Sequence, residues 1–271
     1  MDAADIERKA GSGERLTRED GIALYGCDDL AWLGGLAHQV RTRHSGDTVY
    51  FAAHRSLDVA AGTDVEEAVA LATGAAADGS LELRLTTDAG TDWSGLPHTV
   101  RELRAALPDG VELSACAMHY GGAGASVDPA ACVEQVLRLR ELQDETGGFR
   151  LFVPLLQDGP RGATGAEVLK TFAVARLLFD NVAHVAADWA LHTPQTAQLA
   201  LQHGADELAG QVADDAGEAG QPADALTRED LLDLIRDTGF RPAERDTRHT
   251  VLHAHEGPDP ERRETPQPMR V

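Results

Sequence analysis

The sequence has 271 residues, a formal net charge of −21 at pH 7 and a hydrophobic fraction of 42%. This acid excess argues against nucleic acid or an anionic membrane as a partner, because both polyanions are bound by clustered Lys and Arg side chains. No run of about 18 apolar residues predicts a transmembrane helix, and residues 1–15 do not resemble a signal peptide, so we expect a soluble, cytoplasmic protein.

Two helical patterns precede the first predicted strand. Thr17 is followed by Arg, Glu and Asp, which is typical of a capped helix start with acidic residues in the first turn. A second helix is predicted from Asp28, with Leu33 and Leu36 on one apolar face. We therefore predict an N-terminal helical segment over residues 1–47 that packs on the bottom or side of a barrel.

The central part of the chain, residues 48–252, alternates between short apolar runs and amphipathic helical patterns. Right-handed crossovers between parallel strands would roll about six such β/α units into one α/β domain, a TIM-like (β/α) barrel, closed or partial. The tail, residues 253–271, has no apolar periodicity and four prolines in its last fourteen positions, so it is predicted to be disordered. The predicted strands are 48–53, 81–85, 111–120, 149–155, 182–187 and 206–210.

A helix, a turn and a buried strand follow one another without a gap at residues 137–155. Gly147 and Gly148 are predicted to end the helix, because glycine reaches the left-handed conformation at little steric cost. The apolar run Leu151 to Val153 then predicts a parallel strand that is covered on both faces.

The same junction, RELQDETGGF followed by FVPL, resembles the later barrel of the aminofutalosine synthases and dehypoxanthine futalosine cyclases. These are radical S-adenosylmethionine (radical SAM) enzymes of a menaquinone pathway. The resemblance covers most of the chain and implies a shortened relative on an α/β barrel. Further blocks that resemble the family, in the same order, are GERLTREDGIALYGCDDLAWLGGLAHQVR, VARLLFDNVAHVAADW, ALQHGADELAG and LTREDLLDLIRDTGFRPAERDT.

Two motifs of this family are missing. Radical SAM enzymes hold a [4Fe-4S] cluster with three thiolates from a Cys-x3-Cys-x2-Cys loop, whereas no cysteine lies between Cys27 and Cys116 here. The family's Gly-His-x-Glu segment is also altered, because Tyr120 runs into the small residues GGAG. We therefore expect no [4Fe-4S] cluster, no other resident cofactor and no active radical SAM enzyme. The three widely spaced cysteines indicate reduced thiols rather than disulfides.

Polar residues at the predicted carboxyl ends of the strands are the candidates for ligand binding, because (β/α) barrels bind their ligands at that end. His54 with Arg55 could clamp an anion, although a surface salt bridge is favoured. His119 near Asp188 could form an acid/base pair, although an ordinary hydrogen-bonded pair is favoured. The complete candidate set is His54, Arg55, Thr87, Asp88, His119, Tyr120, Gln157, Asp188 and Asp206.

No metal site is predicted, because His249, His253 and His255 flank the tail rather than a rigid helix. For Asp206, a role in a turn competes with ligand contact. No residue is assigned a catalytic role.

Two classes of function remain open. In the favoured one, the chain is a cluster-less paralogue, a pseudoenzyme that supports or regulates menaquinone synthesis by binding an intact radical SAM relative or a futalosine-like small molecule. In the alternative one, the rim residues carry out cofactor-free acid/base or lyase chemistry. A decaying duplicate without a selected function is a third interpretation.

Overall fold

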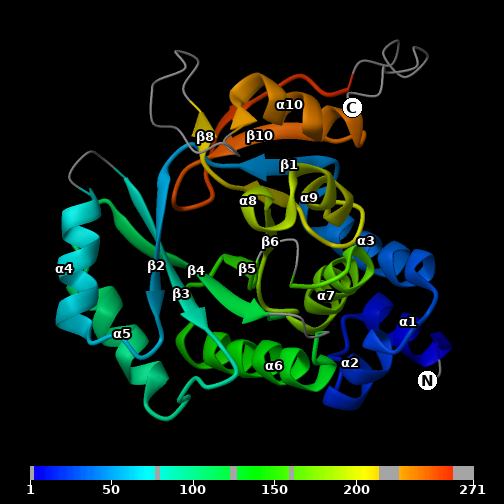
Figure 1. Cartoon of the computed structure of the whole chain (residues 1–271), viewed down its shortest axis with the longest axis horizontal. Helices are drawn as coiled ribbons and strands as arrows, with labels where there is room; N and C mark the ends of the chain where they lie inside the picture. The colour runs from blue at the N-terminus through cyan, green and yellow to red at the C-terminus, as the bar shows by residue number, and fades with distance from the viewer. Residues whose placement is uncertain (1–2, 77–79, 123–126, 159–161, 214–225, 259–271) are drawn as a thin grey trace.

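The computed structural model describes residues 3–76, 80–122, 127–158, 162–213 and 226–258 (Figure 1). Three helices come first, one more than the two predicted: α1 (Ala3–Ser12), which was not predicted, α2 (Arg18–Tyr25) and α3 (Leu30–Ser45). Thr17 caps α2 through a capping box with Asp20. The strands and helices that follow up to β7 are β1 (Thr48–Phe51), β2 (Arg55–Ala60), α4 (Val65–Ala75), β3 (Leu81–Thr87), α5 (Leu96–Ala106), β4 (Val111–Tyr120), α6 (Pro129–Thr146), β5 (Leu151–Leu156), α7 (Gly165–Leu178), β6 (His184–Asp188), α8 (Trp189–His192), α9 (Pro194–Ala200) and β7 (Glu207–Ala209).

The last part of the chain adds a helix and a hairpin to the sheet. Its elements are β8 (Val212–Ala213), β9 (Leu226–Thr227), α10 (Arg228–Asp237), β10 (Arg241–Arg245) and β11 (Val251–Ala254). Within the described residues, the main sheet has the order β11-β10-β1-β7-β6-β5-β4-β3-β2. All neighbouring strands in it are parallel except β10 and β11, which form an antiparallel pair.

The architecture is a partial TIM-like α/β barrel. Six of its parallel strands, β2 to β7, are each followed by a helix before the next strand of the main sheet, which matches the predicted number of β/α units. Two parallel strands were missed. β2 was not predicted because RSLDVA is mostly polar and exposed, and β10 was not predicted because RPAER combines charges with a proline.

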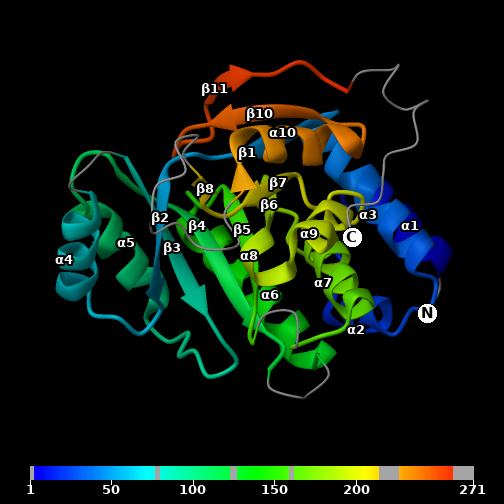
Figure 2. The same ribbon diagram turned by 45° about the horizontal axis from the view of Figure 1, so that its top comes forward.

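The two ends of the sheet, β11 and β2, do not pair with each other. We call the space between β2 and β10, the last parallel strand before β11, the seam. The chain leaves β1 in the middle of the sheet and enters β2 at its far end after only residues 52–54. This crossing therefore carries His54 along the seam, between strands that are not neighbours (Figures 1 and 2). The prediction placed His54 and Arg55 at the carboxyl end of the first strand, but Arg55 is the first residue of a second strand, β2.

Helices cover the outer face of the sheet, and the main apolar core lies between the two layers. Neighbouring helices α4, α5, α6 and α7 pack side by side (Figure 1), and the N-terminal helices α2 and α3 pack against α6 and α7. Phe152, Phe172 and Leu178 are fully buried in this core. The N-terminal segment thus lies on the side of the barrel.

The predicted junction after α6 is confirmed. Gly147 and Gly148 both have positive φ angles, 60° and 81°. The Gln143 side chain closes the turn, since its Nε2 donates to the Phe149 carbonyl at 2.7 Å and its Oε1 accepts from the Phe149 amide at 3.0 Å. The helix therefore turns directly into β5, whose residues are all buried.

A small apolar cluster lies on the inner face of the sheet. Ala115, Ala117 and Ala186 pack there with Leu151 and Val153 in an apolar cluster that contains no residue of the outer helices α4 to α7. Side chains alternate between the two faces of a strand, so Cys116 and Phe152 of the same strands point to the outer core.

Three local features need comment. Asp64 caps α4, because its side chain accepts from the Glu66 amide at 2.8 Å. The predicted boundary of the tail at residue 253 falls inside β11, and residues 259–271 lie outside the described residues, as do 123–126 of the small-residue loop. No helix in the described part of the chain is long and apolar enough to span a membrane.

Candidate functional site

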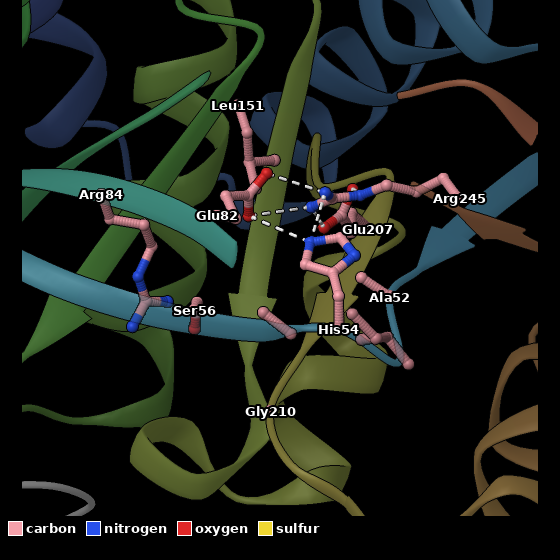
Figure 3. Close-up of a pocket in the computed structure, with 11 residues that line it drawn as sticks. Ala52, His54, Ser56, Glu82, Arg84, Leu151, Glu207, Gly210 and Arg245 are labelled. Atoms are coloured by element: carbon pink, nitrogen blue, oxygen red, sulfur yellow. Dashed lines mark hydrogen bonds and ion pairs between the residues drawn. The ribbon is translucent and has the colours of Figure 1, made fainter. Parts of the chain in front are cut away.

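A pocket opens inside the half-barrel, beside the seam (Figure 3). Its cavity volume is about 30 Å³, within about 320 Å³ of empty space that includes open solvent. The crossing between β1 and β2 contributes His54, and β3, β7 and β10 contribute the charged groups. The lining residues are Ala52, His54, Ser56, Glu82, Arg84, Leu151, Glu207, Leu208, Ala209, Gly210 and Arg245.

Arg245 lies between two buried carboxylates at the base of this pocket, and we call Glu82, Arg245 and Glu207 the inner triad (Figure 3). The Arg245 Nη1 donates to Glu82 Oε1 at 2.7 Å, and its Nε donates to Glu207 Oε2 at 3.1 Å. Arg245 Nη2 also donates one hydrogen bond to each of the two carboxylates. Because Arg245 ends β10 while Glu82 lies on β3, the guanidinium connects the two sides of the seam.

Two histidines lie next to the inner triad. His54 Nε2 accepts from Arg245 Nη1 at 3.1 Å and lies 4.0 Å from Glu82 Oε2. His249, which follows β10 in a turn with a φ of 59°, places its Nε2 3.0 Å from Glu207 Oε2. Burial acts to raise the pKa of Glu82, but His54 and Arg245 outweigh it and hold that pKa below its usual range. Glu207 is likewise buried, and Arg245 with His249 lowers its pKa.

A second ion-pair network lies at the amino end of β6 and β7, next to the inner triad. Asp206 is fully buried and accepts from Arg176 Nη2 at 2.7 Å, from the Val185 amide at 2.7 Å and from Ser45. His184 Nδ1 lies 2.8 Å from the same carboxylate, and its ring stacks on that of His249 with centroids 4.4 Å apart. Asp206 thus links the amino ends of β6 and β7 to helices α3 and α7.

A second group of charges, farther along the strands, is formed by Asp58, Arg84 and Asp188, which we call the outer triad. Arg84 binds Asp58 through Nε at 2.6 Å and Nη2 at 3.1 Å. Its Nη1 is 3.9 Å from Asp188 Oδ2, which is beyond hydrogen-bond distance. Asp188 Oδ1 accepts from the Ala190 amide at 3.0 Å, so this residue also caps α8. Burial raises the pKa of Asp188, and Arg84 only partly opposes this effect.

The structure brings one of the predicted candidates, His54, to the pocket lining. Asp188 does not line the pocket, although its neighbours Arg84 and Ala209 do. His119 is half-buried on β4, and its carbonyl accepts from Gln135. In the described residues Asp188 contacts Arg84 rather than His119, so the two do not form a pair.

The other candidates lie outside the pocket lining. Arg55 and Asp88 are exposed, and Asp88 Oδ1 accepts from the Gly90 amide in a turn. Thr87 donates to the Ala117 carbonyl across the sheet, and the Tyr120 hydroxyl is buried 2.8 Å from His192 Nε2. Gln157 is exposed after β5, and Asp206 belongs to the ion-pair network at the amino ends of β6 and β7.

Glu82, Arg84, Glu207 and Arg245 were not predicted as site residues. One signal was present in the sequence, because LELRL alternates apolar and charged residues and so places Glu82 and Arg84 on one face of a strand. The position of Arg245 could not be predicted, since β10 itself was missed.

The residues present do not fit the [4Fe-4S] cluster that the resemblance implies. Such a cluster needs three convergent thiolates, whereas Cys27 follows α2, Cys116 lies in β4 and Cys132 lies in α6, all buried. Burial raises the pKa of Cys116 and raises that of Cys132 to about 11, which disfavours the thiolate. Among the described residues, no group of three or more His, Cys, Asp or Glu side chains is placed to hold a metal ion.

Comparison with known proteins identifies relatives over the whole chain. The model of the CofH/MqnC C-terminal region matches residues 154–256. The aminodeoxyfutalosine synthase of Streptomyces coelicolor is 41% identical over an alignment of 391 positions that covers 100% of both chains. Because this chain has only 271 residues, the Streptomyces protein contains stretches without a counterpart here.

Two further relatives match shorter parts. The cyclic dehypoxanthine futalosine synthase of S. coelicolor is 34% identical over 46% of this chain and 34% of its own. The aminodeoxyfutalosine synthase of Thermus thermophilus is 40% identical over 40% of this chain and 33% of its own. This chain thus matches about a third of each of these two proteins.

Solved structures confirm the fold. HydG, a maturase of the [FeFe]-hydrogenase, superposes with a TM-score of 0.63 at 12% identity, covering 89% of this chain and 75% of its own. Methylornithine synthase (PylB) superposes with a TM-score of 0.58 at 14% identity, covering 88% and 97%. At this level of identity the similarity concerns the fold alone.

Proposed function

This chain belongs to the aminodeoxyfutalosine synthase family, and we propose that it is a cluster-less member that binds a futalosine-like small molecule inside its half-barrel without radical chemistry. In this role it supports or regulates menaquinone synthesis as a pseudoenzyme. The observation that carries the proposal is the pocket beside the seam, whose wall holds a buried Glu–Arg–Glu triad and no thiol.

The chemistry of the pocket supports binding more than turnover. Arg245 is saturated by its two carboxylates, His54 and the Asp246 carbonyl, so its N–H groups are occupied in the absence of a ligand. A general acid or base needs a proton that it can exchange with a substrate. Glu82 and Glu207 have lowered pKa values and firm partners, which makes them poor proton donors.

Asp188 favours a second candidate function, cofactor-free acid/base or lyase chemistry. It is 8% exposed, and burial raises its pKa, as in many catalytic carboxyl groups. Against this role, no imidazole is hydrogen-bonded to the Asp188 carboxylate in the described residues, because His192 Nδ1 contacts only the Asp188 carbonyl, at 2.9 Å. We therefore keep catalysis as the alternative and ligand binding as the conclusion.

The binding proposal can be tested with aminodeoxyfutalosine, the compound in the name of the relatives. Equilibrium dialysis should show saturable binding to the full chain and no consumption of the compound. Ser56 is exposed and lines the pocket, so Ser56→Phe should fill the site and abolish binding without disturbing the core. Ser80→Phe, at an exposed position before β3, is the matched control and should bind as the parent does.

Binding that is equal in Ser56→Phe and in the parent would place the compound elsewhere and refute this assignment of the site. Conversion of the compound by the purified protein would favour the catalytic alternative. If no binding occurs, affinity purification from the native cells becomes the deciding measurement. Enrichment of an intact radical SAM relative would then replace the small molecule by a protein partner.

A further inference from the structure

Most charged groups of the pocket lining already bind one another. Arg245 donates to Glu82 and Glu207 through Nε, Nη1 and Nη2, and its Nη1 also donates to His54 Nε2. Every carboxylate oxygen of the inner triad accepts at least one of these hydrogen bonds. A ligand that leaves the inner triad intact must therefore use other groups of the lining.

Arg84 is the charged residue of the lining that keeps a donor free. Its Nε and Nη2 donate to Asp58 at 2.6 and 3.1 Å. Its Nη1 donates no hydrogen bond in the part of the chain that the structure describes, and Asp188 Oδ2 is 3.9 Å away from it. The Arg84 side chain is only 11% exposed. A largely buried N–H group without a partner costs free energy, and an acceptor atom on a ligand would remove that cost.

Ser56 supplies a second donor at the same place. It lies on β2 two residues before Asp58, the register partner of Arg84, so its side chain is on the same face of the sheet. Both Ser56 and Arg84 line the pocket, and Figure 3 shows the serine beside the guanidinium. Among the described residues, the Ser56 hydroxyl has no hydrogen-bond partner. A hydroxyl can donate a hydrogen bond, so Ser56 and Arg84 together present donors to a ligand.

The surroundings of Arg84 favour an uncharged acceptor over an anion. Asp58 already neutralises the guanidinium, and Asp188 lies near its remaining nitrogen. Burial raises the pKa of Asp188 and Arg84 only partly opposes this effect, so negative charge is poorly compensated here even without a ligand. A carboxylate ligand at Arg84 Nη1 would bring another negative charge next to Asp188 and would be repelled. A carbonyl oxygen accepts the same hydrogen bond without this repulsion.

We propose that the pocket binds an uncharged carbonyl group, such as that of an amide, whose oxygen accepts hydrogen bonds from Arg84 Nη1 and Ser56 Oγ. This inference rests on the proposed function and specifies which group of the ligand the site recognises. The cavity volume of about 30 Å³ exceeds the roughly 10–15 Å³ that one water-sized group needs. The carbonyl group therefore fits in the cavity, and the rest of the ligand extends into the space that is open to solvent.

The test compares three probes of nearly the same shape: butyramide, sodium butyrate and n-butylammonium chloride. Affinities for the full chain are measured from the NMR signals of each probe. The guanidinium resonances of isotope-labelled arginine report the site, and Arg84→Lys identifies those of Arg84 by removing them. Butyramide should bind saturably and more tightly than the other two probes, and it should shift the Arg84 resonances.

Two variants of the site and two controls make the test specific. Ser56→Ala should weaken butyramide binding about twofold to tenfold, because a hydrogen bond between uncharged groups is lost. Arg84→Lys keeps the charge but lacks Nη1, and it should weaken binding about tenfold or more. Ser80→Ala and Arg248→Lys make the same changes at exposed positions and should leave the affinity unchanged. Ser56 is itself exposed, so Ser56→Ala tests the site even if Arg84→Lys disturbs the fold.

Tighter binding of butyrate or of n-butylammonium than of butyramide would overturn the inference. The same conclusion would follow if butyramide did not bind saturably, or if the parent and both site variants bound it equally. The two proposals fail separately. If aminodeoxyfutalosine binds but butyramide does not, only the recognised group is wrong. If butyramide binds and Ser56→Phe abolishes this binding, but aminodeoxyfutalosine does not bind, only the pathway assignment is wrong.

Discussion

Arg245→Met should destabilise the fold more than any other single change at the site. The substitution removes a guanidinium that is 1% exposed and leaves Glu82 and Glu207, which are 3% and 1% exposed, without their cation. Removing one partner of a buried ion pair costs about 3–5 kcal/mol, because the remaining charge is neither hydrated nor paired. Urea denaturation at pH 7 should therefore show a fall in the free energy of unfolding of about this size.

The pH dependence supplies a second readout of the same variant. In the parent, Arg245 and His54 hold the pKa of Glu82 below its ordinary value of 4.5 against the opposing effect of burial. Stability from this group is therefore present above the unfolded pKa and is lost as the pH falls through the lower, folded pKa. In Arg245→Met only burial and the histidine remain, and the pKa of the carboxyl rises. The difference in unfolding free energy between parent and variant should shrink as the pH is lowered from 7 toward 5.

Two further variants separate charge from packing. Arg248→Met removes an exposed arginine that pairs with Glu112 at 2.7 Å, and it should cost less than about 1 kcal/mol. Replacing the whole inner triad by Gln, Met and Gln should be less harmful than Arg245→Met, because no unpaired charge stays buried. If Arg245→Met and Arg248→Met lose the same stability, the inner triad does not hold the seam as described.

The remaining predictions concern the junction, the cluster and the outer triad. Gly148→Val should lower the stability by about 1–3 kcal/mol and Gly147→Val by less. Both positions need a positive φ, but only at Gly148 would a Cβ also lie 2.9 Å from Arg104 Cζ. Equal melting temperatures of both variants and the parent would contradict this prediction. Anaerobic incubation with iron and sulfide should give no stoichiometric [4Fe-4S] spectrum, and S-adenosylmethionine should yield no 5′-deoxyadenosine in a chromatographic assay. Burial raises the folded pKa of Asp188 above 3.8, so the folded state loses stability relative to the unfolded state as the pH rises through this window. At pH 7, Asp188→Asn should consequently unfold at a higher urea concentration than the parent. Below pH 3.8 the two proteins should unfold at the same urea concentration. If the variant is less stable than the parent at pH 7, Asp188 is better compensated than its distances indicate.

The features that could be predicted from the sequence are local ones. Gly147 and Gly148 reverse the chain through their own conformational freedom, and Thr17 caps α2 with a residue three positions away. The six β/α units follow from periodicity, because each strand and helix shows its pattern within a short window. Such features depend on neighbours along the chain, and the structure confirms them.

The features that could not be predicted depend on distant parts of the chain. Arg245 and Glu82 are 163 residues apart in sequence, and their contact requires β10 to lie beside β1 and the chain to cross from β1 to β2 along the seam. A five-residue strand with two arginines, a glutamate and a proline has no apolar pattern of its own. It forms because β1 offers it a parallel partner and β11 an antiparallel one.

The open seam and the charged pocket have a common physical origin. A closed barrel would join β10 and β2 by backbone hydrogen bonds and fill its interior with side chains. Here the described strands make no such ladder, and the Arg245 side chain reaches from β10 to β3 instead. A guanidinium in that position needs carboxylates from both sides, and the alanines of the inner face leave the space in which these charges and a ligand can lie together. Replacing Ala209, which packs against the inner cluster and lines the pocket, with a larger residue would therefore narrow the pocket.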